Sequence, residues 1–212
     1  YGGGNSSNFL KLGYPGLDIP LKDYQDFKKE SIKRDSVIFL SIPKSPFLEI
    51  LEPMIEATLE AGYRVVYKTH NGHLELREIE QSLVLKWEKY KNFIFYTQAN
   101  LSLEELARSI TIVEFRSSML YTYPLITHKP ALLLQPLEAN IQDNFYEKRL
   151  HIKIFTKEEL LQVIAKLEHN KGFRMQREDL IKDFITRDSY CYGNASIAIA
   201  KYIQEYFQIY ID

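Results

Sequence analysis

Residues 36–68 read SVIFLSIPKSPFLEILEPMIEATLEAGYRVVYK, and the pattern in this stretch indicates the fold class. It opens with four apolar residues at 37–40, a short continuous run of the kind found in a buried parallel strand. Serine and proline at 45–46 then provide an N-cap and a first-turn proline for a helix, which a glycine ends. Apolar residues recur along this helix at helical spacing, at Leu48, Leu51, Ile55 and Leu59. A second strand is expected at 64–68, so the stretch predicts a β-α-β unit.

The same alternation of strand and helix continues to the end of the chain. Further strands are expected at 93–96, 110–115, 131–134 and 152–155. Further helices are expected at about 73–90, 102–109, 117–127, 157–168, 178–185 and 195–207. Ser102 and Glu105 lie three residues apart, which is the spacing of a capping box for the short helix that they begin. The pattern predicts an α/β protein with a Rossmann-like, doubly wound parallel sheet that carries helices on both faces.

The first 35 residues differ in character from the rest. Residues 1–8 are rich in Gly, Ser and Asn and contain too little apolar surface to order themselves. Residues 12–18 are rich in turn formers, and a polar stretch follows to Asp35. We therefore expect an N-terminal linker segment at 1–35 and a Rossmann-like, nucleotide-donor-binding domain with C-terminal helices at 36–212.

Composition excludes several classes of protein. The formal net charge is −1 and no stretch concentrates Lys and Arg, which argues against a dedicated nucleic-acid-binding protein. Cys191 is the single cysteine, so an internal disulfide and a thiolate metal cluster are both excluded. No apolar run approaches the ~20 residues needed to span a bilayer. We therefore expect a cytoplasmic location, either free or peripheral at the inner face of the membrane.

The common nucleotide and hydrolase motifs are missing from the sequence. No Gly-x-Gly-x-x-Gly follows a predicted strand, and there is neither a P-loop nor a Gly-x-Ser-x-Gly nucleophile elbow. A classical NAD site is therefore not expected, and we expect no cofactor. Any anion site in this sheet has to rely on side-chain hydroxyl groups and helix N-termini.

Ligands of an open parallel sheet bind outside the carboxyl ends of its strands, so the residues after each strand are candidates. Ser41 and Lys44 follow the first strand and precede a helix N-terminus, a combination that suits an anion. Lys68 and His70 follow the second strand, where a histidine can act as a general base or donate to a phosphate oxygen. Both segments can also be read as ordinary polar loops. A metal site at His70 would lack a third ligand at the required spacing.

Arg116, Ser117 and Ser118 follow the fourth strand and begin a helix. Two hydroxyl groups and the free N–H groups of a first helical turn can surround a phosphate, and the helix dipole adds to the attraction. Arg116 could supply a bidentate contact to the same anion. Simple N-capping by Ser117 would explain one serine, but not the set of three residues.

These segments together resemble a known family. The sequence has Gly-Tyr-Pro-Gly-Leu-Asp at 13–18, Lys-Thr-His at 68–70, paired serines at 117–118, His-Lys-Pro at 128–130 and Gly-Asn-Ala-Ser at 193–196. This order resembles the C-terminal half of CDP-glycerol glycerophosphotransferases and related capsule and teichoic-acid transferases of the GT-B fold. Two departures stand out. Glu-Phe-Arg occupies 114–116 where the family has Thr-Asp-Tyr, and Asn71 replaces a proline.

The resemblance implies a function for this chain and a separate half that binds the acceptor. In that family the corresponding histidine and paired serines line the nucleotide-diphosphate site, which implies His70 as the catalytic residue here. Lys68, Arg116, Ser117, Ser118, Ser41 and Lys44 are then expected around the donor diphosphate. A complete GT-B transferase has two Rossmann-like halves, so the resemblance implies an N-terminal acceptor domain or partner chain and a polysaccharide or lipid-linked acceptor. A donor other than CDP-glycerol, a GT-B-like sugar-nucleotide epimerase and a non-catalytic nucleotide-binding module remain open.

Overall fold

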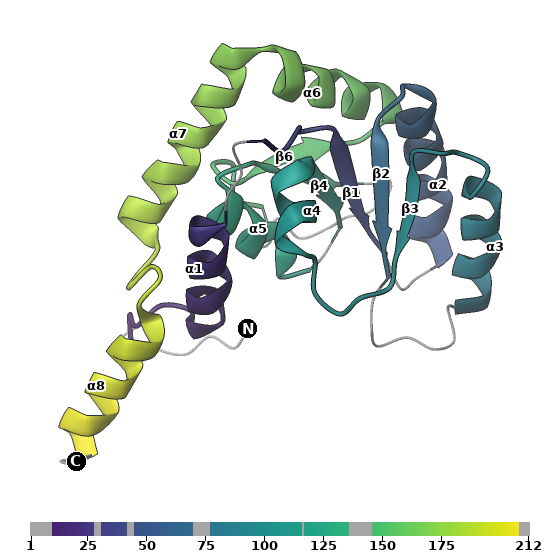
Figure 1. The fold of residues 1–212 in the computed structure, drawn as a ribbon. Helices are drawn as coiled ribbons and strands as arrows, with labels where there is room; N and C mark the ends of the chain where they lie inside the picture. The colour runs from purple at the N-terminus through teal and green to yellow at the C-terminus, as the bar shows by residue number, and fades with distance from the viewer. Residues whose placement is uncertain are drawn as a thin grey trace.

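The computed structural model describes residues 10–27, 31–41, 45–69, 77–115, 117–135 and 146–207, and these form a three-layered α/β structure (Figure 1). Six strands form one sheet in the order β3-β2-β1-β4-β5-β6, and every neighbouring pair is parallel. The strands are β1 (Ser36–Leu40), β2 (Arg64–Lys68), β3 (Phe93–Tyr96), β4 (Ser109–Glu114), β5 (Ala131–Leu134) and β6 (His151–Ile154). The predicted Rossmann-like, doubly wound sheet is therefore confirmed, and each predicted strand lies within one residue of an observed one.

One face of the sheet is covered by three helices. They are α2 (Ser45–Glu60), α3 (Arg77–Trp87) and α6 (Lys157–His169). Val37 and Phe39 of β1 point to this face and join a core that includes Trp87 of α3. The indole of Trp87 is fully buried and meets the ring of Tyr67 edge-on, with 5.6 Å between ring centroids. Alternate residues of a strand therefore point to opposite faces of the sheet, because successive side chains of a β-strand point in opposite directions.

The opposite face is covered by four helices. They are α1 (Asp18–Asp26), α4 (Leu103–Arg108), α5 (Met119–Thr127) and α7 (Lys171–Asp188). Ile38 and Leu40 of β1 belong to the core on this side. Helix α1 was not predicted, because its few apolar residues lie among polar ones and their helical spacing was not recognised. Leu17, Leu21 and Tyr24 follow one another at helical spacing and are buried in this second core.

The N-terminal part of the chain also packs against its C-terminal helix, α8 (Ala195–Phe207). A 3-10 turn, η2 (Pro15–Leu17), leads into α1 and contacts α8. Gly13, with φ of +82°, lies so close to the link between α7 and α8 that a Cβ there would stand 2.2 Å from the carbonyl oxygen of Tyr190. Only glycine fits this position without displacing the backbone. Residues 13–18 and 193–196, which are 175 or more residues apart, thus form one contact region.

Three helix predictions require correction. The predicted helix at 178–185 is the second part of α7, which begins at Lys171 because Asn170 caps it by accepting a hydrogen bond from the amide of Phe173 at 2.9 Å. The helix predicted to 90 ends at Trp87, and its predicted start at 73 lies outside the described residues. The capping box of α4 is only half formed. Ser102 Oγ accepts from the amide of Glu105 at 3.1 Å, but the Glu105 carboxylate is occupied elsewhere.

Candidate functional site

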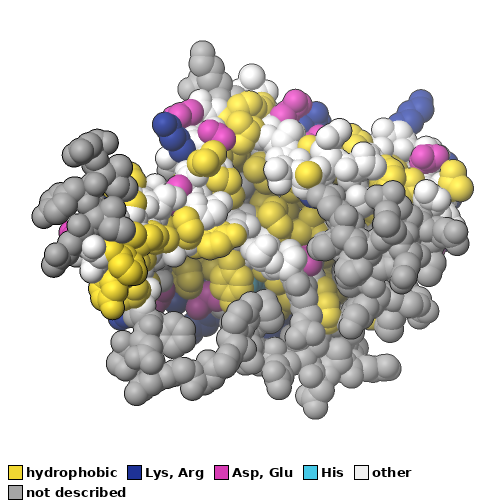
Figure 2. All heavy atoms as spheres, turned by 90° about the horizontal axis from the view of Figure 1, so that it is seen from below, with side chains coloured by type: hydrophobic (Ala, Val, Ile, Leu, Met, Phe, Trp, Pro, Cys, Tyr) yellow, Lys and Arg dark blue, Asp and Glu magenta, His cyan; other side chains and the backbone are white. Residues whose placement is uncertain are grey.

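The topology reverses between β1 and β4, because the chain adds strands on one side as far as β3 and then on the other side from β4 to β6. In such sheets ligands bind at this reversal, outside the carboxyl ends of the two strands. Figure 2 looks onto this carboxyl edge, from below the view of Figure 1. The predicted site residues that the structure describes are Ser41, Lys68, Ser117 and Ser118, and all four follow or end strands at this edge.

Ser41 occupies the middle of the arrangement. It follows β1, is 6% exposed, and donates its backbone N–H to the carbonyl oxygen of Lys68 at 2.8 Å. On its other side, β1 pairs with β4 as far as Phe39 and Val113, two residues before Ser41. Strand order therefore places Ser41 between the segment that contains Lys68 and the segment that leads to Ser117.

Lys68 ends β2 and holds the neighbouring loop. Its Nζ donates to the carbonyl oxygens of Gln98 at 2.9 Å and Thr69 at 3.3 Å. Burial lowers the pKa of the Lys68 ammonium group, because a charged group loses solvation there. The neutral carbonyl oxygens do not cancel the positive charge. An anion at this edge would therefore gain from a partly desolvated cation.

Ser117 and Ser118 begin α5, and the structure separates their roles. Ser117 Oγ accepts a hydrogen bond from the amide of Met119 at 3.1 Å, so this serine does serve as a local cap. The amide of Thr122 returns to the carbonyl oxygen of Ser118, but the Ser118 side chain makes no capping bond and is exposed. The capping alternative thus applies to Ser117, whereas a phosphate contact by Ser118, whose side chain caps nothing among the described residues, stays a prediction.

Three predicted site residues, Lys44, His70 and Arg116, lie outside the described residues. The expectation that His70 and the two serines face one cleft therefore stays a prediction. The described neighbours in sequence are Thr69 for His70 and both Phe115 and Ser117 for Arg116. Thr69 continues the ladder by donating its N–H to the carbonyl oxygen of Tyr96 at 3.2 Å, so the chain remains at the carboxyl edge up to that residue.

Two polar residues at the same edge were missed from the sequence. Glu114 is the last residue of β4 and is only 4% exposed. Gln135 directly follows β5, and its Oε1 atom is buried without a hydrogen-bond partner among the described residues. Buried polar atoms are rarely left unpaired, so Gln135 is suited to a ligand contact. Both residues could have been identified from the sequence, because each is polar and stands at the end of an apolar strand, at the edge where ligands bind.

The described ranges, 10–27, 31–41, 45–69, 77–115, 117–135 and 146–207, bear on metal binding and on membrane insertion. Within those ranges no three His, Cys, Asp or Glu side chains gather closely enough to hold a metal ion. Across the same residues, no helix combines the length and the apolar character that crossing a bilayer demands.

Comparison with known proteins gives structural matches only. No family model matches the sequence, and no curated protein does. The structure is similar to the wall teichoic acid polymerase TagF, with a TM-score of 0.61 and 15% identity over 97% of this chain and 54% of that chain. It is similar to a putative UDP-N-acetylglucosamine 2-epimerase from Listeria monocytogenes, with a TM-score of 0.60 and 16% identity over 98% of this chain and 56% of that one.

A third match is the UDP-GlcNAc 2-epimerase of Methanocaldococcus jannaschii in complex with UDP-GlcNAc and UDP, with a TM-score of 0.57 and 14% identity over 87% of this chain and 56% of that chain. The chain thus spans about half the length of these structures. At such low identity the similarity establishes the fold. The chain is a Rossmann-like domain corresponding to one half of a GT-B architecture.

Proposed function

We propose that this chain is the donor-binding half of a GT-B transferase that handles a nucleotide-diphosphate-linked sugar or polyol in the synthesis of a cell-surface polysaccharide. One observation carries the proposal. The strand order reverses between β1 and β4, and hydroxyl-bearing residues Ser41, Ser117 and Ser118 follow those two strands. The similarity to TagF, one structure of which was soaked with CDPG, supports a CDP-linked polyol as the leading donor.

The proposed donor site binds the diphosphate through hydrogen-bond donors and positive charges. The N-terminus of α5 and the Ser118 hydroxyl group receive phosphate oxygens, and Ser117 can still donate its hydroxyl hydrogen although its oxygen accepts from Met119. Lys68, Lys44 and Arg116 supply positive charge, with Ser41 at the centre of the edge. His70 protonates or stabilises the departing diphosphate. Such donors stabilise a leaving diphosphate without a covalent nucleophile.

The proposal includes a second half that binds the acceptor, as a domain or partner chain. Helix α8 projects beyond the sheet on the side of its carboxyl edge (Figure 1). Its exposed apolar residues, Ile197, Ile203, Tyr206 and Phe207, range from 45% to 67% exposed. Figure 2 shows hydrophobic atoms gathered over this helix, beside the proposed donor edge. Exposed apolar surface of this kind is typical of an interface, and we assign it to the acceptor half.

Calorimetric titration of the chain with CDP, UDP and CMP tests the donor site. We expect a diphosphate to bind more tightly than a monophosphate, and Arg116→Ala to lose roughly 1–3 kcal/mol of affinity, the range for a charge-assisted contact. Ser118→Ala should weaken binding by up to about tenfold. Ser31→Ala is the matched control, because Ser31 is exposed in a turn before β1, at the other edge. No binding at millimolar concentration, or equal binding by all variants, would refute the assignment.

An epimerase is the second candidate, because one of the similar structures is a UDP-GlcNAc 2-epimerase and another carries the name putative UDP-N-acetylglucosamine 2-epimerase. The two enzymes differ in what they require. Epimerisation of UDP-GlcNAc needs no acceptor, whereas transfer consumes the donor only when an acceptor is present. We expect the chain alone to bind a nucleotide diphosphate without multiple turnover. Release of a C2 epimer by the chain alone would favour the epimerase.

A further inference from the structure

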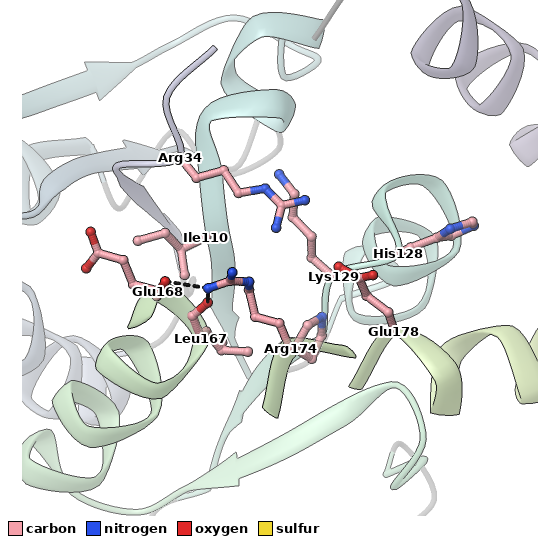
Figure 3. A pocket seen from close by; sticks show the side chains of 9 residues that line it. Arg34, Ile110, His128, Lys129, Leu167, Glu168, Arg174 and Glu178 are labelled. Carbon is pink, nitrogen blue, oxygen red and sulfur yellow. Dashed lines mark hydrogen bonds between the residues drawn. The ribbon is translucent and has the colours of Figure 1, made fainter. Parts of the chain in front are cut away.

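A pocket of about 370 Å³ lies at the amino edge of the sheet, on the opposite side from Ser41 and Ser117. Its walls come from the segment before β1, the start of β4, the loop between α5 and β5, the end of α6 and the first half of α7 (Figure 3). Its volume falls within the roughly 300–1,000 Å³ typical of small-molecule sites. None of the donor-site residues proposed above lines it.

Three cationic side chains from different elements converge on this pocket. Arg34 enters from the segment before β1, Lys129 from the loop before β5 and Arg174 from α7 (Figure 3). Lys129 is only 3% exposed, and its Nζ donates to the carbonyl oxygens of Leu106, Ala107 and Ser109 at 2.8, 2.9 and 2.6 Å. Arg174 donates to the carbonyl oxygens of Leu167 and Glu168. These acceptors are neutral dipoles and do not themselves cancel positive charge, but they occupy all three N–H groups of the Lys129 ammonium, so Lys129 offers an anion its charge alone.

Arg34 distinguishes this cluster from a purely structural one. Arg34 is an exposed residue that no hydrogen bond or ion pair joins to another described residue, and its guanidinium group turns toward Lys129 and the pocket in Figure 3. Like charges brought together in this way repel one another unless an anion lies between them. Arginine is also the side chain best matched to phosphate, through two parallel N–H···O bonds.

The two carboxylates at the pocket do not cancel this charge. The Glu168 carboxylate points out of the pocket, toward His169, with 3.2 Å between Glu168 Oε2 and His169 Nε2. Glu178 reaches in from α7 between His128 and Lys129 and opposes one of the three cations (Figure 3). A net positive charge therefore remains. Besides His128, the remaining wall residues are Ile110, Pro130 and Leu167, which are apolar.

We propose that this pocket binds a small organic phosphate, with its phosphate group hydrogen-bonded by Arg34 and Arg174 beside the buried charge of Lys129. Its organic part lies against Ile110, Pro130 and Leu167. The site is separate from the donor edge and does not depend on the proposed transferase function. Because α7 and the loop before β5 both line it, a ligand there would contact a helix that packs against α5 and the loop that directly follows α5.

Calorimetric titration of the full 212-residue chain with inorganic phosphate and phenyl phosphate tests the proposal. We expect both to bind, and phenyl phosphate more tightly because its ring covers the apolar wall. Arg34→Gln should weaken binding at least about tenfold. Glu178→Gln should strengthen it about fivefold, because it removes the carboxylate that faces the anion. Glu168→Gln is the matched control and should change nothing, since that carboxylate points away.

The opposite signs expected for Arg34→Gln and Glu178→Gln separate ligand binding from structural damage, which would weaken binding in both. Equal affinity for the two ligands would identify free inorganic phosphate as the occupant. Arg34→Gln should leave CDP affinity at the donor edge unchanged, because Arg34 lines the pocket at the opposite edge, and this separates the two sites. No binding of either ligand, binding that Arg34→Gln leaves intact, or weaker binding by Glu178→Gln would overturn the proposal.

Discussion

Asp18 accepts two hydrogen bonds from the first turn of α8, although 178 residues separate it from Ser196. Its Oδ2 atom receives the amide of Ser196 at 2.7 Å, and its Oδ1 atom receives the amide of Ala195 at 3.2 Å. The carboxylate therefore caps a helix from a distant part of the chain, in the way that an N-cap residue does locally. The same contact fastens the start of the described structure to its last helix.

The Asp18 contact predicts a pH-dependent stability. Its hydrogen bonds with Ser196 and Ala195 lower the pKa of the Asp18 carboxyl group below the ordinary value of 3.8, because they favour the charged form. The stabilisation is therefore fully present above pH 3.8 and is lost as the pH falls through the lowered pKa. We expect Asp18→Ala to lower Tm by about 2–4 °C at pH 7.

Thermal unfolding between pH 7 and pH 3 checks this prediction. Asp18→Asn is the matched variant, because it keeps an acceptor oxygen but cannot titrate. The difference in Tm between the wild type and Asp18→Asn should shrink below pH 3.8. A difference that stays constant down to pH 3 would contradict the prediction.

A second prediction concerns the ion pair that replaces half of the predicted capping box. Both guanidinium nitrogens of Arg64 lie 2.5 Å from the Glu105 carboxylate, and the two side chains are only 15% and 12% exposed. Removal of either partner leaves a poorly solvated charge, so Arg64→Met or Glu105→Gln should cost about 2 kcal/mol of unfolding free energy. A double-mutant cycle in urea measures the coupling.

The pair of Lys86 and Glu52 provides the control for that cycle. Its nitrogen and oxygen also lie 2.5 Å apart, but the side chains are 45% and 28% exposed, and Lys86 has Glu56 as a second partner. Its coupling should be clearly smaller, because water screens the charges. Equal coupling in the two cycles would show that burial does not set the strength of the Arg64 pair.

A third prediction separates stability from binding at Gln135. Its buried Oε1 atom has no hydrogen-bond partner in the described ranges, so Gln135→Leu should leave the unfolding free energy unchanged or raise it by up to about 1 kcal/mol. If the amide group contacts the donor, the same variant should weaken CDP binding by up to about tenfold. Urea unfolding and calorimetry on the same variant decide the matter. Unchanged affinity would remove Gln135 from the site.

The last prediction addresses the apolar surface of α8. Because Ile203 and Phe207 are 45% and 61% exposed, replacing both with serine should change the unfolding free energy by less than about 0.5 kcal/mol for each residue. Binding of a hydrophobic dye such as anilinonaphthalene sulfonate should fall, since the patch is lost. A large loss of stability would instead mean that these side chains support the fold.

The sequence predicted the sheet well because buried parallel strands have a simple signature. The apolar runs at 37–40 and 131–134 are short, continuous and followed by polar residues, and each matches an observed strand closely. Helix ends were harder to predict when a cap determined them. Asn170 caps α7, which begins at Lys171, seven residues before the predicted start at 178. Residues 171–177 show no apolar stripe that would have indicated a helix.

Long-range contacts could not be read from local patterns. The sequence indicated that Asp18 lies in a turn-rich segment and Ser196 near the start of the last helix, but no local pattern indicated that they touch. The convergence of Arg34, Lys129 and Arg174 depends on three elements that meet only in the folded chain. At the carboxyl edge, the approximate position of Ser41 and Ser117 could be predicted, because parallel strands place their ends together.

The strand order has a consequence for folding. Strands β1 to β3 are contiguous in sequence and form one side of the sheet, and β4 to β6 form the other, so a single pairing of β1 with β4 joins them. A loop of more than sixty residues has to close before the hydrogen bonds between β1 and β4 can form. Loop closure of this length slows folding relative to a helical chain of equal size. Ribosomal synthesis, which delivers β1 to β3 first, suits this topology because one side can assemble while β4 is still being made.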